Sequence, residues 1–135
     1  MNPYARPQAY RESSVLTASP EQLVVMLYDG ALRFLRQSEA AFGEEAYTHG
    51  GERMARAEAI IDELLATLDM GVGELAERLQ AIYVFCKRQL IDARLERDAT
   101  KIRTVIRLLD DLRDAWAQLA AGGGSQGPSM PPLVA

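Results

Sequence analysis

Residues 17–35, TASPEQLVVMLYDGALRFL, decide the fold, because they have the features of the start and first half of a long helix. Four helix-start signals follow one another in residues 19–22: an N-cap serine, a proline, an acidic residue for the helix dipole and a glutamine that completes a capping box. We expect this helix to run to about Phe42 and to stop at Gly43.

This first helix carries more apolar side chains than one face needs. Five of them are enough for a core-facing stripe, namely Leu23, Met26, Leu27, Phe34 and Leu35. Four more are surplus, namely Val24, Val25, Tyr28 and Ala31. Two interpretations stay open, since bundle helices often bury a wide arc, whereas a groove for a partner helix would also leave apolar side chains in excess.

Three further amphipathic segments follow. A second helix is clear from Met54 to Leu68, but the pair Gly50–Gly51 leaves two starts open, one near Glu44 and one near Glu52. The third is expected from about Gly73 to Arg97, with a stripe of Leu75, Leu79, Ile82, Cys86 and Leu90. The fourth follows a cap at Asp98, with a stripe of Ile102, Val105, Leu109, Leu112, Trp116 and Leu119.

These patterns predict an all-α protein, an antiparallel four-helix bundle over residues 20–121. Residues 1–19 are predicted to be an extended N-terminal arm. Residues 122–135 are predicted to be a disordered Gly/Pro/Ser tail, because they carry no charge and no helical periodicity.

Composition excludes several function classes. A chain of 135 residues has room for one domain, and its net charge of −4 argues against nucleic-acid binding. It has no apolar run long enough for a membrane span or a signal peptide, and its single cysteine cannot form an internal disulfide. We therefore expect a cytoplasmic protein without membrane insertion. The basic excess from Lys87 to Arg113 is either a set of solvated helix faces or a docking patch.

No catalytic, metal or cofactor site is predicted. His49 is the only histidine, whereas a di-iron bundle needs a Glu-x-x-His motif on each of two helices. Cys86 lies on the apolar stripe of the third helix, where a thiol is expected to be buried and inert. The chain is therefore not expected to be an enzyme.

The sequence resembles the flagellin export chaperone family, FliS. The family's signature is a tyrosine, here Tyr10, followed by V-x-T-A-S-P-x-x-L in residues 15–23, M-L-Y-D-G-A in residues 26–31 and F-L in residues 34–35. The third helix shares Tyr83, Phe85, Arg88, Leu90 and Ala93 with the family pattern, and the fourth ends in a similar LLDDLRDAW.

This resemblance implies a helical bundle that binds the disordered C-terminal segment of flagellin in the cytoplasm, prevents its premature polymerisation and delivers it to the cytoplasmic domain of the export gate. It also implies that the N-terminal arm covers part of the binding surface until flagellin displaces it. The candidates for flagellin binding or arm docking are Tyr10, Val15, Leu16, Leu23, Val24, Leu27, Tyr28, Ala31, Tyr83 and Ile106.

Gly30 is expected to let a neighbouring helix approach closely, since a glycine inside a helix otherwise only lowers stability. The alternative to a chaperone is a structural bundle whose wide apolar faces form a homodimer through the first and fourth helices.

Overall fold

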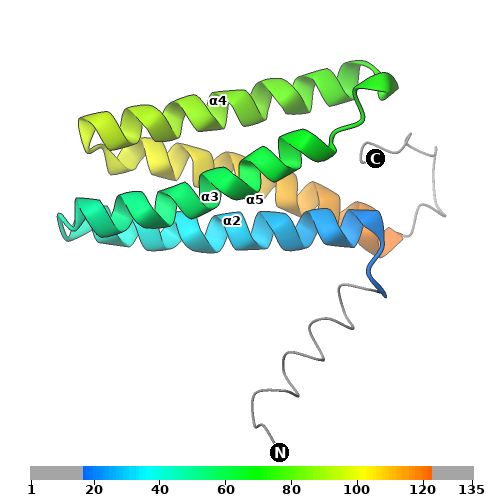
Figure 1. The fold of residues 1–135 in the computed structure, drawn as a ribbon. Coiled ribbons are helices and arrows are strands. Elements are labelled where there is room, and N and C mark those ends of the chain that lie inside the picture. Colours follow the sequence, from blue (N-terminus) through cyan, green and yellow to red (C-terminus); the bar gives the residue numbers. More distant parts are fainter. Residues whose placement is uncertain (1–16, 123–135) are drawn as a thin grey trace, which may run out of the picture.

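The computed structural model describes residues 17–122, which form four long α-helices and one short 3-10 helix. They are α2 Pro20–Gly43, α3 Tyr47–Thr67, the 3-10 helix η1 Met70–Val72, α4 Glu74–Glu96 and α5 Ala99–Gly122. Successive long helices run in opposite directions (Figure 1). The predicted antiparallel four-helix bundle is confirmed, whereas most of the predicted arm and tail, residues 1–16 and 123–135, lies outside the described residues.

Helix α2 begins where its sequence signals stand. The Ser19 Oγ accepts a hydrogen bond from the Gln22 backbone N–H at 3.2 Å, and the Gln22 Oε1 accepts one from the Ser19 N–H at 2.7 Å. This is the predicted capping box. The helix ends at Gly43 as predicted, but the left-handed residue that redirects the chain is Glu45, with a φ of 59°.

Helix α3 begins at Tyr47, between the two predicted starts. A Cβ atom at Gly50 would lie 2.5 Å from the Phe42 Cδ1, so only glycine lets this turn press against the end of α2. The Gly50 carbonyl also accepts a hydrogen bond from the buried Ser38 hydroxyl at 2.7 Å. This close contact offsets the intrinsic cost of a glycine in a helix.

The core face of α2 differs from the predicted stripe. The predicted stripe is wrong for Leu23 and Met26, which are exposed. The buried side chains of this helix are Val24, Tyr28, Ala31, Leu32, Leu35, Ser38, Ala41 and Phe42. Because α2 packs against both α3 and α5, the centre of its buried arc lies between these two neighbours. Most of the surplus apolar side chains therefore belong to the core.

The other stripes are largely confirmed. Met54, Ala57, Ile61 and Leu64 of α3, and Ile102, Val105, Leu109 and Trp116 of α5, are buried, while Leu68, Leu112 and Leu119 are partly buried against this core. On α4 the prediction is wrong for Leu75, which is exposed in the first turn, where a helix end has neighbours on fewer sides. The stripe also lacks Tyr83, which is buried in the core.

The four helices contact one another in a ring. α2 and α4 each pack against α3 and α5, so α2 and α4 stand diagonally across the core. The predicted role of Gly30 is confirmed, because a Cβ there would lie 3.2 Å from the Ile60 Cδ1 of α3.

The turn between α4 and α5 uses two local signals. Arg97 has a left-handed φ of 54° and ends α4. The Asp98 Oδ1 then accepts a hydrogen bond from the Thr100 backbone N–H at 2.9 Å, so Asp98 caps α5 as predicted. This short connection places α5 antiparallel to α4.

Candidate docking surfaces

Eight large apolar side chains are exposed in residues 17–122, and they fall into two groups. The first group, here called the end patch, comprises Leu23, Met26, Met70 and Leu75. The antiparallel topology places the start of α2, the connection after α3 and the start of α4 at the same end of the bundle (Figure 1). This end is also the one at which residues 1–16 and 123–135 join the bundle.

The second group lies along α4. Val84, Ile91 and Leu95 follow one another at spacings of seven and four residues, so they share one helix face, here called the α4 stripe. Leu95 is 77% exposed and Ile91 is 45% exposed. Phe85, 43% exposed, lies about 100° further round the helix. Because the core of the bundle is already filled, the α4 stripe contributes nothing visible to internal packing.

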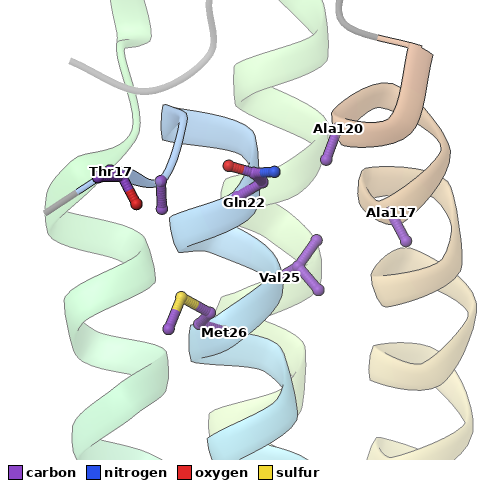
Figure 2. A pocket seen from close by; sticks show the side chains of 7 residues that line it. Thr17, Gln22, Val25, Met26, Ala117 and Ala120 are labelled. Atoms are coloured by element: carbon purple, nitrogen blue, oxygen red, sulfur yellow. The ribbon is translucent and has the colours of Figure 1, made fainter. Parts of the chain in front are cut away.

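A pocket of about 510 Å³ opens beside the first turns of α2. Its lining is Thr17, Ala18, Gln22, Val25, Met26, Ala117 and Ala120. Figure 2 shows Val25 and Gln22 on the side of α2 that faces α5, where Ala117 and Ala120 lie, whereas Thr17 and Met26 lie on the other side of α2. No charged side chain lines this pocket.

The structure separates the ten predicted site residues into three sets. Val24, Tyr28, Ala31 and Tyr83 are buried in the core, at most 3% exposed, where a partner cannot reach them without opening the bundle. Leu23 is exposed, whereas Leu27 and Ile106 are partly buried against the core. Tyr10, Val15 and Leu16 lie outside the described residues. Of the predicted residues that are described, only Leu23 presents a large exposed apolar surface.

Tyr28 and Tyr83 meet across the diagonal of the bundle. Their hydroxyl groups hydrogen-bond to each other, and either hydroxyl can be the donor. Burial raises the pKa of Tyr28 above its usual range and that of Tyr83 to about 12, so both phenols stay protonated. This hydrogen bond joins α2 to α4 across the core.

Cys86 and His49 are the remaining side chains that were considered for a catalytic or metal-binding role. Cys86 is fully buried as predicted, and burial raises the pKa of its thiol to about 12, which removes the reactive thiolate. His49 is exposed. No group of three metal-ligating side chains occurs within residues 17–122. Over the same residues, no helix has the length and hydropathy needed to span a membrane.

Most of the basic side chains from Lys87 to Arg113 form ion pairs with acidic side chains of neighbouring helices. Lys87 and Arg94 of α4 pair with Asp62 and Glu58 of α3. Lys101, at the start of α5, pairs with Glu96 at the end of α4, at 2.8 Å. Arg103 and Arg113 of α5 pair with Glu39 and Asp29 of α2, at 3.2 Å and 2.9 Å. Asp29 thus joins α2 to α5.

Partial signals for the exposed residues outside the prediction are present in the sequence. Phe85 and Ile91 do not belong to the predicted stripe of the third helix. An apolar residue outside such a stripe is a candidate for exposure to solvent. Leu95 and Val84 lie on the same face as Ile91, so a helical wheel centred on Ile91 would have found the α4 stripe. Met70 lies in a connection, where periodicity carries no information.

A family model described as "Flagellar protein FliS" matches residues 1–123 of this chain. The chain belongs to the FliS family. The flagellar secretion chaperone FliS of Bacillus subtilis is 36% identical over 117 residues, covering 87% of this chain and 85% of the relative. The corresponding FliS chaperone of Salmonella typhimurium is 38% identical over 111 residues, covering 81% and 82%. FliS is a family of chaperones in flagellar export and not of enzymes.

A solved structure supports the same FliS fold. It is described as a crystal structure of a flagellar chaperone from bacteria and matches with a TM-score of 0.71 at 20% identity. The match covers 87% of this chain and 98% of that chain. At this identity the similarity shows that the two chains share a fold.

Proposed function

We propose that this FliS protein binds the C-terminal segment of flagellin in the cytoplasm, prevents its premature polymerisation and delivers it to the export gate. The observation that carries the proposal is the α4 stripe, together with the end patch: large apolar side chains remain exposed on a bundle whose core is complete. Surfaces of this kind on a soluble bundle mark places where another chain docks.

The α4 stripe suits a helical partner. Val84, Ile91 and Leu95 extend over three turns, which matches the anchor spacing of an amphipathic helix laid along a groove. A disordered segment gains helix only by burying its apolar face on such a prepared surface, so binding and folding are coupled. Flagellin bound in this way would present no free helix for polymerisation.

The N-terminal arm is the second part of the proposal. Residues 1–16 join the bundle at Thr17, at the end that carries the end patch, so Val15 and Leu16 are tethered close to Leu23. We propose that the arm covers Leu23 and gives way when flagellin binds. Removing the arm then removes a competitor for the same surface.

The test is titration calorimetry with a peptide of about forty residues from the C-terminus of this protein's own flagellin. We expect saturable 1:1 binding with a negative heat-capacity change, and tighter binding by a chain that lacks residues 1–16. Replacing both Ile91 and Leu95 by serine is expected to weaken binding about a hundredfold or more, since each anchor contributes about 1.4 kcal/mol or more when buried. The exposed Glu63→Ser variant is the matched control and is expected to bind normally.

The outcomes separate the parts of this proposal. Absence of heat at about 50 μM protein, where even a micromolar complex forms, would overturn flagellin binding itself. Equal affinity of the serine variants and the control would move the site away from the α4 stripe. Concentration-dependent oligomers without peptide binding would favour the homodimer, although the apolar faces of α2 and α5 already pack against each other within one chain.

A further inference from the structure

The pocket beside α2 is lined in part by the last turns of α5, from which the rest of the chain continues. The FliS match ends at residue 123, so the last twelve residues of this chain are additional to the shared domain. These residues include the apolar sequence Met130-Pro-Pro-Leu-Val134, which follows a Gly/Ser-rich stretch. We propose that residues 130–134 of the same chain dock in the pocket between α2 and α5.

The first argument is that the segment is long enough to extend from the end of α5 to the pocket. The pocket is lined by Ala117 and Ala120, and α5 ends at Gly122, so from Ala117 the helix continues for about 7.5 Å to its end. Seven residues separate Gly122 from Met130. A Gly/Ser-rich chain of this length has a root-mean-square span of about 15 Å. The segment is therefore tethered at a distance that matches the pocket, which gives a millimolar effective concentration.

Chemistry is the second argument. The lining side chains are uncharged, and five of the seven lining residues are apolar, namely Val25, Met26 and three alanines. Residues 122–134 carry no charged side chain, whereas the N-terminal arm contains Arg6, Arg11 and Glu12. Docking the tail thus buries no side-chain charge, and two consecutive prolines restrict its backbone before it binds. A flexible thioether such as Met26 adapts to bulky side chains of varied shape.

Size is the third argument. The alanines of α5 leave space that larger residues would fill, and a pocket of about 510 Å³ accommodates several side chains such as those of Met130, Leu133 and Val134. The docked tail would lie directly next to Met26 of the end patch. This docking is a property of one chain and does not depend on which partner the protein binds.

Methionine methyl NMR tests the proposal, because the chain has five methionines in different settings. Met26 lines the pocket, Met54 is buried in the core, and Met70 is exposed at the same end of the bundle but does not line the pocket. Spectra of the full chain are compared with those of a chain that ends at residue 126 and of a Leu133→Ser/Val134→Ser variant. We expect the Met26 signal to shift in both, with Met54 and Met70 unchanged and with a nuclear Overhauser contact between Met26 and Met130 in the full chain.

Two controls make the result decisive. A Ser125→Ala/Gln126→Ala variant alters the linker without removing apolar side chains and is expected to leave Met26 unchanged. A peptide of residues 128–135, added to the truncated chain at millimolar concentration, is expected to return the Met26 signal toward its full-chain position.

Three results would overturn the proposal. The first is an identical Met26 signal in all variants. The second is a Met26 shift that follows removal of residues 1–16 but not removal of the tail, which would assign the pocket to the arm. The third is a Met26 signal in the full chain that changes with protein concentration, which would assign the docked tail to a second copy.

Discussion

At the scale of single residues, three buried features hold this bundle in one arrangement. Gly50 permits a backbone contact that no larger residue allows, Ser38 bonds to its carbonyl, and the Tyr28–Tyr83 pair spans the core. A small change to any of these residues is therefore expected to change the free energy of unfolding measurably. Neighbouring positions in the same helices provide controls.

Gly50 and Gly51 are adjacent in α3, but Gly50 is tightly packed whereas Gly51 has space for a side chain. A Cβ at Gly50 would lie 2.5 Å and 2.7 Å from two ring carbons of Phe42, whereas a Cβ at Gly51 would meet only the Arg94 Nε at 3.8 Å. We expect Gly50→Ala to lower the free energy of unfolding by about 1–3 kcal/mol through overpacking. Gly51→Ala is expected to raise it by about 0.5–1 kcal/mol through helix propensity. Urea unfolding followed by circular dichroism measures both, and shifts of the same sign would contradict this account.

The tyrosine pair predicts a cost for removing either hydroxyl. Tyr28→Phe and Tyr83→Phe each leave the buried hydroxyl of the other tyrosine without its partner. Each change is expected to cost about 1–3 kcal/mol of unfolding free energy.

A double-variant cycle tests the direct bond between the two tyrosines. The cost of the Tyr28→Phe/Tyr83→Phe double change is expected to fall below the sum of the two single costs, because the second change removes a group that is already unpaired. Simple additivity in chemical denaturation would mean that the two hydroxyls are not coupled.

At the scale of elements, the position of α2 between two neighbouring helices accounts for its excess of apolar residues. This helix packs against α3 on one side and α5 on the other, and its buried arc must serve both contacts. Helix α4 has the opposite character, since one of its faces carries Val84, Ile91 and Leu95 toward solvent. The position of an element in the ring, rather than its own pattern, decides how much of its apolar surface is internal.

The start of α2 depends on one hydroxyl. Ser19→Ala removes the acceptor of the Gln22 N–H and is expected to lower the free energy of unfolding by about 1 kcal/mol. Ser19→Asp keeps an acceptor at the N-cap and is expected to retain most of the stability. Thermal and urea unfolding of the two variants should differ clearly, and equal losses would show that the capping bond contributes nothing.

At the scale of the whole molecule, stability is unevenly distributed. The contacts of α2 with α3 and α5 are more extensive than those of α4 with the same two helices. Three ion pairs also join α2 to α5, through Asp29, Arg36 and Glu39. Exposed pairs of this kind each contribute at most about 1 kcal/mol, so the difference rests mainly on apolar packing.

Native-state hydrogen exchange is expected to reveal this gradient. Amides in the middle of α2, around Tyr28 to Leu35, should be the most protected, and amides in the C-terminal turns of α4, around Ile91 to Leu95, should exchange by more frequent local opening. Binding of the flagellin peptide along the α4 stripe should slow the α4 amides most. Uniform protection across all four helices would contradict the gradient.

The sequence by itself determined the helices, most of their ends and the fold class. Capping residues and three-four spacing act locally, so the signals at Ser19, Asp98 and the α5 stripe needed no tertiary information. The family was also readable, because the signature in residues 15–35 is a continuous string of residue types.

Only the tertiary structure decided which apolar side chains face inward. On α2, a rotation of the buried arc by less than a quarter turn exchanges Leu23 and Met26 for Val24 and Tyr28, and only the packing of α3 and α5 on either side sets that rotation. The start of α3 at Tyr47 depended likewise on the fit of Gly50 against Phe42. Periodicity gives the width of an apolar arc, but its direction follows from the neighbours that a helix meets when the chain folds.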